Sequence, residues 1–184
     1  MSPNYTAEIT VAATSQEAYD AILRVPDWWG RITGTTTAVG DEFVYVVPGL
    51  HYSGFRVTEL EPGCRVAWLV TGSHLDFVSD TQEWTGTTVA FDISPAADGT
   101  GTTVVFAHEG LTPEVECYEV CTNAWSMFVT GSLKSLIETG AGQPYDFDGT
   151  EALTSDDHED LHRGVREALA SGADGGAAAA GRGA

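Results

Sequence analysis

Basic residues are scarce in this sequence. Eight Lys and Arg residues stand against 27 Asp and Glu residues in a chain of 184, and the formal net charge is −19. Lys134 is the only lysine. Clustered Lys and Arg side chains supply most of the affinity for nucleic-acid phosphates and for anionic membrane surfaces. The scarcity therefore excludes a general nucleic-acid-binding protein and disfavours binding to an anionic bilayer.

Cysteine is also rare, and hydrophobic runs are short. Three cysteines do not make a disulfide framework, and an odd number favours reduced thiols. No stretch approaches the ~20 apolar residues of a membrane-spanning helix. Residues 1–11 have neither the basic region nor the long apolar run of a secretory signal. These absences predict a cytoplasmic protein with no membrane span.

Several motifs that identify common enzyme classes are missing. The sequence has no phosphate-binding GxxxxGK, no nucleophile-elbow GxSxG, no HExxH and no dinucleotide-binding GxGxxG after a strand. Cys117 and Cys121 lie one helical turn apart and with His108 would make only a partial metal site. We therefore predict no metal and no cofactor, and we interpret the two cysteines as small hydrophobic residues. An enzyme that works inside a shaped pocket stays open.

What the sequence does contain is a regular succession of elements. Alternating hydrophobicity predicts strands over residues 5–12, 42–47, 51–60, 65–71, 83–93 and 102–108. Thr14 and Glu17 form a capping box that opens a helix, and Pro26 ends it. Connections as short as residues 98–101 join only antiparallel strands. Thr112 is the predicted N-cap of a long helix that runs to residue 139.

This order predicts an α+β fold, a twisted antiparallel sheet covered on one face by the long C-terminal helix. Bulky side chains between these two layers can enclose a cavity. Residues 1–143 are the predicted domain. Residues 144–184 are rich in Ala and Gly, contain nine acidic and three basic residues, and are predicted to be a mostly disordered tail with a short helix over 156–170.

Aromatic residues occur on nearly every predicted element. They either pack as a solid core or line a pocket for an apolar or aromatic ligand. His108 shares a strand face with Val104 and Phe106 and is the weak catalytic candidate, either a general acid/base or a core histidine satisfied by a backbone carbonyl. The candidate ligand-binding residues are Trp29, Phe43, Tyr45, Trp68, Trp84, Phe91, Phe106, His108, Cys121, Trp125 and Phe128.

Several segments together resemble one known superfamily. They are residues 84–87, 91–93, 101–104, 108–111, 117–121 and, most specifically, 131–140 with the sequence GSLKSLIETG. The pattern is similar to the START-like (SRPBCC, helix-grip) superfamily. Within it, the pattern is most similar to bacterial proteins labelled homologues of the activator of heat-shock protein 90 ATPase. The resemblance covers about residues 5–144.

The resemblance implies a seven-stranded antiparallel sheet that grips a long C-terminal helix around a hydrophobic cavity. The superfamily includes lipid and hormone carriers and aromatic polyketide cyclases. The leading hypothesis is a single-domain cytoplasmic protein that binds a small hydrophobic or aromatic molecule, without an assigned enzymatic activity. One alternative is a cyclase- or dehydratase-like enzyme in which His108 moves a proton. The other is a regulator of a chaperone ATPase, and a homodimer is a further expected assembly.

Overall fold

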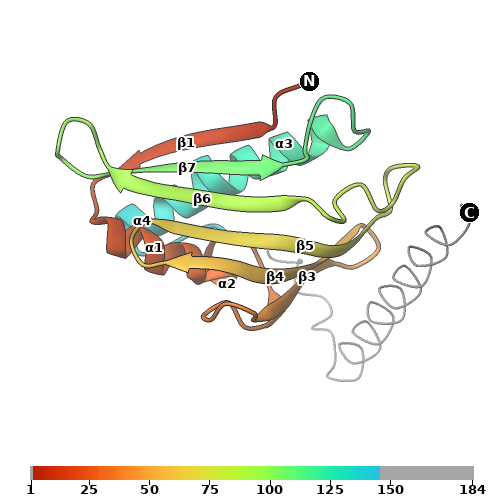
Figure 1. Cartoon of the computed structure of the whole chain (residues 1–184), viewed down its shortest axis with the longest axis horizontal. Coiled ribbons are helices and arrows are strands. Elements are labelled where there is room, and N and C mark those ends of the chain that lie inside the picture. Colours follow the sequence, from red (N-terminus) through yellow and green to blue (C-terminus); the bar gives the residue numbers. More distant parts are fainter. Residues whose placement is uncertain (1, 146–184) are drawn as a thin grey trace, which may run out of the picture. The chain divides into compact units, whose positions relative to one another are not determined.

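A computed structural model describes residues 2–145 of the chain. These residues form one seven-stranded antiparallel sheet with the strand order β1-β7-β6-β5-β4-β3-β2 (Figure 1). The strands are β1 (Tyr5–Val11), β2 (Ile32–Gly34), β3 (Glu42–Val47), β4 (His51–Glu61), β5 (Arg65–Leu75), β6 (Thr88–Pro95) and β7 (Thr102–Glu109). The first and last long strands, β1 and β7, are neighbours, so one edge of the sheet joins the start of the chain to the strand before the C-terminal helix.

Two groups of helices cover one face of this sheet. The short helices α1 (Ser15–Leu23) and α2 (Val25–Trp28) follow β1. After β7, three helical segments follow one another without a break, α3 (Tyr118–Ser126), the π-helix η1 (Met127–Leu133) and α4 (Lys134–Thr139). Figure 1 looks onto the uncovered face of the sheet, with the helices behind it. The α+β helix-grip fold predicted from the sequence is confirmed.

Alternation along the strands decides which side chains face the helices. In β3, Phe43, Tyr45 and Val47 are buried while the residues between them are half-buried. In β7, Val104, Phe106 and His108 are buried in the same way. The side chains on this inner face form the core, because only one face of the sheet is covered.

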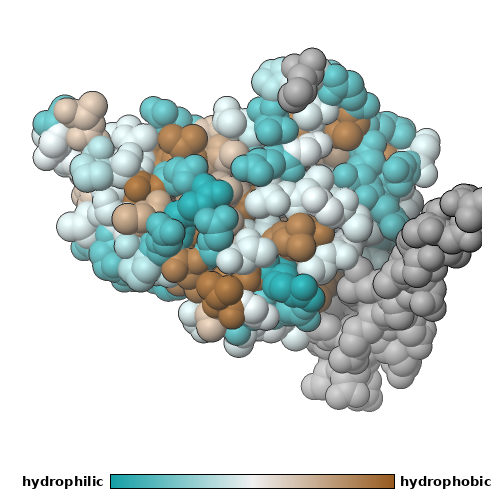
Figure 2. Space-filling view, in the orientation of Figure 1, coloured by the Kyte–Doolittle hydropathy of each residue, from teal (hydrophilic) through white to brown (hydrophobic). Residues whose placement is uncertain are grey.

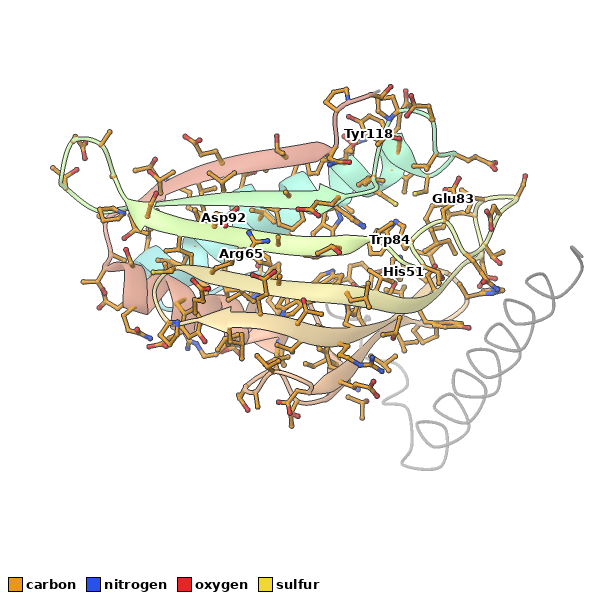
Figure 3. All side chains as sticks on the ribbon, in the orientation of Figure 1. His51, Arg65, Glu83, Trp84, Asp92 and Tyr118 are labelled. Atoms are coloured by element: carbon orange, nitrogen blue, oxygen red, sulfur yellow. The ribbon has the colours of Figure 1, made fainter. Side chains whose placement is uncertain are left out.

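The uncovered face carries a charged group that spans three strands (Figure 3). Arg65 of β5 donates to Glu59 of β4 at 2.8 Å and to Asp92 of β6 at 2.5 Å. Figure 2 shows hydrophilic residues and residues of intermediate hydropathy over this face, with separate hydrophobic patches between them. Ion pairs this exposed contribute little to stability, so we assign this group no role in the site.

Two helix ends agree with the sequence predictions. The Thr14 side chain accepts from the Glu17 N–H, and the Glu17 carboxylate accepts from the Thr14 N–H at 2.8 Å, which completes the capping box. Gly140 ends α4 in the left-handed conformation with φ 80°. Within residues 2–145, no helix is long and apolar enough to cross a lipid bilayer.

Three predicted boundaries are wrong. The strand predicted over 83–93 begins only at Thr88, because residues 83–87 form turns in which the Thr87 hydroxyl donates to the Trp84 carbonyl. The helix predicted from residue 113 begins at Tyr118, since the Thr112 hydroxyl donates to the Glu114 side chain instead of capping a helix. Strand β5 extends to Leu75 rather than ending at residue 71.

Two elements have no counterpart in the predictions from individual residues. The three-residue strand β2 is too short to show an alternating pattern. The π-helix η1 interrupts the long helix without a proline or any other recognisable signal. Of the tail predicted over 144–184, only residues 144 and 145 are described, and Tyr145 pairs with Gly30 as an isolated β-bridge. The rest of the predicted tail and the helix predicted over 156–170 lie outside the described residues.

Candidate functional site

A cavity of about 170 Å³ lies at one end of the inner sheet face, between the sheet and the C-terminal helices. Strands β3 and β4 supply one wall, and α3 with the start of η1 supplies the other. Six of the eleven candidate ligand-binding residues line it, namely Trp29, Tyr45, Trp84, Cys121, Trp125 and Phe128. Most of the lining is carbon, so the cavity favours apolar contents.

Four aromatic side chains give the cavity flat walls. Trp29 stacks on Tyr45 with ring centroids 4.3 Å apart and an angle of 18° between the ring planes. Trp84 stacks on Trp125 at 5.7 Å and 12°, and Trp125 contacts Trp29 at 4.7 Å. Large rings that pack on one another lose little conformational freedom when a ligand binds. The arrangement offers preformed flat faces to a planar molecule.

The other five candidate residues do not line the cavity. Phe43, Trp68, Phe91 and Phe106 are at most 1% exposed and contact one another in a chain, with centroid distances of 5.1, 5.3 and 5.2 Å between successive rings. These contacts form a filled core beside the cavity. For these four residues the solid-core alternative of the sequence analysis is the one observed.

His108, the fifth, is fully buried, and both of its ring nitrogens have partners. The Trp125 indole N–H donates to Nδ1 at 3.1 Å, and Nε2 lies 2.8 Å from the Thr87 hydroxyl. The Thr87 hydroxyl also donates to the Trp84 carbonyl at 2.6 Å. These contacts are mutually consistent when a neutral imidazole carries its proton on Nε2 and donates it to Thr87.

Burial lowers the pKa of His108 from 6.5 to about 3, with a smaller contribution from His51. The side chain is therefore neutral near pH 7 and has no free nitrogen for a substrate proton. Its partners are side chains rather than the backbone carbonyl expected from the sequence. The geometry fits a residue that positions Trp84 and Trp125, the two stacked walls of the cavity.

A second histidine, His51, was not among the sequence candidates. It lines the cavity from the first position of β4, and its Nε2 lies 2.7 Å from the Ser53 hydroxyl. Its ring meets the Trp84 ring edge-on at 4.7 Å. Burial lowers the pKa of His51 to about 3. Counting by twos from the apolar Phe55 and Val57 along the predicted strand would have placed His51 on the inner face.

The loop between β5 and β6 supplies Phe77 and Trp84 to the cavity, and two carboxylates tie it to the start of α3. The Glu83 carboxylate accepts from the backbone N–H groups of Glu116 at 2.6 Å and Cys117 at 2.8 Å. Glu116 in turn accepts from the Ser79 N–H at 2.9 Å. Glu83 therefore caps a helix whose own N-cap residue, Cys117, provides no side-chain cap. In Figure 3, Glu83, Trp84 and His51 lie at the same end of the sheet.

The buried thiols of Cys117 and Cys121 lie beside this cap. Contact with Cys121 and burial raise the pKa of the Cys117 thiol above its ordinary value. The Trp84 N–H lies near this sulfur but outside hydrogen-bond geometry, so Trp84 Nε1 has no conventional partner among the described residues. A thiol with a raised pKa is a poor nucleophile. Within residues 2–145, no group of three or more His, Cys, Asp or Glu side chains is placed to hold a metal ion.

Exposed apolar side chains surround the cavity entrance. We call Leu50, Val120, Met127 and Tyr145 the rim. Their exposed fractions are 46%, 57%, 61% and 45%. Among the described residues one further large hydrophobic side chain is exposed, and it lies outside the cavity. Exposed apolar surface gathered around a pocket is typical of a binding site.

Residues 141–145 bring Tyr145 to the rim. The Ser132 hydroxyl donates to the Trp28 carbonyl at 2.7 Å and accepts from the Gln143 N–H at 2.6 Å. A Cβ atom on Gly142 would lie 2.1 Å from the Asp27 carbonyl oxygen, so only glycine allows this close approach. The Tyr145 N–H then donates to the Trp29 carbonyl at 2.9 Å.

Comparison with known proteins identifies the fold. No family model and no curated protein sequence matches the chain. Among solved structures, the Aha1 dimer from Colwellia psychrerythraea is 26% identical, with a TM-score of 0.61 over 76% of this chain and 99% of that one. A protein from Mesorhizobium loti is 16% identical, with a TM-score of 0.58 over 73% of this chain and 96% of the other.

A third similar structure is DynU16, described as a putative protein in the dynemicin biosynthetic locus. It is 20% identical, with a TM-score of 0.56 over 77% of this chain and 49% of DynU16. Identities of 16% and 20% show a shared fold and nothing finer. The chain has the START-like helix-grip fold, and Aha1 from Colwellia psychrerythraea is among the solved structures that it resembles.

Proposed function

We propose that this protein binds a small apolar or aromatic molecule in the cavity between the sheet and the C-terminal helix. One observation carries the proposal: an apolar cavity with aromatic walls and an exposed apolar rim. The fold supports it, because helix-grip proteins of the START-like superfamily include carriers of small hydrophobic molecules. The protein is proposed to act in the cytoplasm, as expected from the sequence.

The volume of the cavity limits the size of the ligand that it can enclose. An apolar cavity of about 150 Å³ in another protein is known to bind benzene. At about 170 Å³ this cavity has room for one aromatic ring with a short substituent. A whole lipid or a four-ring polyketide does not fit inside without extending past the rim. The proposal therefore favours a single-ring ligand or the ring-bearing end of a longer one.

Ethylbenzene is a suitable probe for this proposal. We expect saturable binding by isothermal titration calorimetry and a rise in the melting temperature with probe concentration, since a ligand that binds only the folded state stabilises it. Ala124→Phe fills the cavity from α3 and should abolish binding. Asn123→Phe, the adjacent exposed position outside the cavity, is the matched control and should bind normally. Equal binding by both variants would refute the proposed site.

Catalysis of the cyclase or dehydratase type stays a prediction. It requires a group that exchanges protons and faces the cavity. Both ring nitrogens of His108 are engaged, so we propose that His108 positions Trp84 and Trp125. Aromatic polyketide cyclases belong to the superfamily that the sequence resembles, which motivates a test with aromatic polyketide intermediates. Turnover that survives His108→Gln would exclude this histidine as the proton-transfer group.

Regulation of a chaperone ATPase and formation of a homodimer also stay predictions. Both are motivated by the similarity to an Aha1 protein whose solved structure is a dimer. Stimulation of a bacterial Hsp90-type ATPase at micromolar concentration would support the first. A mass of twice 19.5 kDa by light scattering would support the second.

A further inference from the structure

His51 is the histidine that faces the cavity. Alternation along β4 places it on the inner face with Ser53 and Phe55. Its ring meets Trp84 at 4.7 Å and Tyr45 at 5.6 Å, both edge-on. Protein surrounds the ring closely enough to lower its pKa to about 3, yet part of its surface stays accessible. Since His51 lines the cavity, that accessible surface faces the cavity.

The contact with Ser53 decides which ring nitrogen carries the proton. Ser53 is fully buried, and its hydroxyl has one hydrogen-bond partner among the described residues, His51 Nε2 at 2.7 Å. A buried hydroxyl proton without an acceptor is costly, so the Ser53 hydroxyl donates to Nε2. The neutral imidazole then carries its own proton on Nδ1. No acceptor for Nδ1–H is found among residues 2–145, which leaves an unused donor at the cavity wall.

The charge of the lining restricts the acceptor that this donor can meet. Among residues 2–145, neither Lys nor Arg lines the cavity, and His51 itself is neutral near pH 7. An anionic ligand group would lose its hydration here without gaining a counter-charge. A neutral acceptor such as a carbonyl oxygen loses much less on entering and gains the hydrogen bond.

We infer that His51 Nδ1–H donates a hydrogen bond to the carbonyl oxygen of a small uncharged aromatic ligand. The cavity then selects aromatic ketones, aldehydes or esters over aromatic carboxylates, and His51 is the residue that determines this selectivity. The inference rests on the proposed function, since it names the ligand class of the same cavity.

Tyr45 is the competing donor, because its hydroxyl belongs to a side chain that also lines the cavity. Burial raises the pKa of Tyr45 above its ordinary value, and the neighbouring Tyr145 adds to the effect. The two phenols therefore lie close enough to interact with each other. Tyr45→Phe separates the two donors experimentally.

The first test is the infrared carbonyl band of carbon-13-labelled acetophenone bound to the wild-type protein. A hydrogen bond from His51 should move this band below its frequency in hexane. The shift should disappear in His51→Phe and persist in Tyr45→Phe. A hexane-like band in the wild type, or a shift lost only in Tyr45→Phe, would overturn the inference.

The second test compares the Kd of acetophenone with that of ethylbenzene, which has nearly the same shape but no acceptor. His51→Phe should weaken acetophenone relative to ethylbenzene by about fivefold, the size expected for one neutral hydrogen bond. Tyr52→Phe, the next residue on the opposite face, should leave the ratio unchanged. Benzoate should bind weakest of the three probes.

The outcomes distinguish this inference from the proposed function beneath it. If ethylbenzene binds and the ratio stays the same in His51→Phe, the cavity binds aromatics but His51 does not select the ligand. If neither probe binds the wild type, both proposals fail. Tighter binding of benzoate than of acetophenone would overturn the inference by itself.

Discussion

The interior between the sheet and the helices has two halves that use the same residue types differently. In the packed half, Phe43, Trp68, Phe91 and Phe106 contact one another with no cavity between them. In the cavity half, Trp29, Tyr45, Trp84 and Trp125 stack around open space. The packed half contributes stability through burial, whereas the cavity half leaves apolar surface uncovered, as the proposed binding of an apolar ligand requires.

The polar groups divide in the same way. His51 and Ser53 lie on the cavity half, and the chain of contacts through His108 and Thr87 lies where the halves meet. In the packed half, the Trp68 indole N–H is buried without a hydrogen-bond partner among the described residues. In the cavity half, hydrogen-bonded polar groups hold the walls in place.

Truncating a ring in the packed half should have the largest effect on stability. Phe91→Ala is expected to lower the free energy of unfolding by about 3–5 kcal/mol, since it leaves a void among close-packed rings. Phe128→Ala in the cavity wall should cost at least ~1 kcal/mol less, because that side chain already borders open space. Urea denaturation measures both losses of unfolding free energy, provided that the m-value is the same in each variant and in the wild type. Equal losses would remove the distinction between the halves.

Acidification should destabilise the protein through its buried neutral histidines. The pKa of His108 is about 3 in the folded state against 6.5 unfolded, so between these values the unfolded state binds the extra proton. Stability is fully present above pH 6.5 and falls as the pH drops toward 3, by about 1.4 kcal/mol per pH unit for each such histidine.

His108→Gln provides the control for this pH dependence. Glutamine can still accept from Trp125 and donate to Thr87 but does not titrate. The slope of unfolding free energy between pH 6 and pH 4 should fall by about 1.4 kcal/mol per pH unit. His51→Gln should lower the slope by a similar amount, because the pKa of His51 is also about 3 in the folded state. An unchanged slope in His108→Gln would mean that this histidine is already protonated in the fold.

Removing the carboxylate cap should have a moderate effect. Glu83→Ala leaves the Glu116 and Cys117 N–H groups without their acceptor and should cost about 1–2 kcal/mol. Glu83 also holds the loop that carries Trp84, so aromatic-probe binding should weaken as well. Glu109→Ala, an exposed position whose carboxylate accepts no described hydrogen bond, is the matched comparison and should change neither property.

A substitution in the rim should have the smallest effect on stability. Met127→Gln replaces a 61%-exposed side chain with another good helix former, so the unfolding free energy should stay within about 0.5 kcal/mol. Ethylbenzene binding should weaken by about two- to threefold through lost apolar contact at the entrance. Val39 is equally exposed but does not line the cavity, so Val39→Gln should leave binding unchanged. An identical loss in both variants would indicate a nonspecific effect.

Much of the fold could be predicted from the sequence because its signals are local. Alternation located six of the seven strands, and the Thr14–Glu17 box located the first helix. The start of α3 could not be predicted this way. Its cap comes from Glu83, which lies 34 residues before Cys117. A contact between residues this far apart in the sequence leaves no local sequence pattern that could predict it.

The candidate site was predictable only in part, for a similar reason. Aromatic composition indicated which residues gather between the layers but not which of them pack and which leave space. That division depends on how Trp84 enters from a loop and how Tyr145 returns to Trp29. His51 was not among the predicted site residues, although simple alternation along the strand places it on the inner face with Phe55.

The most direct test of the difference between the halves uses the five tryptophan indole N–H signals in a nitrogen-15 correlation spectrum. During titration with acetophenone, the signals of Trp29, Trp84 and Trp125 should show the largest shifts and should saturate together. The signals of Trp28 and Trp68 should stay nearly in place, since both indoles are buried outside the cavity. No shift in any signal, or the largest shift at Trp68, would contradict the account.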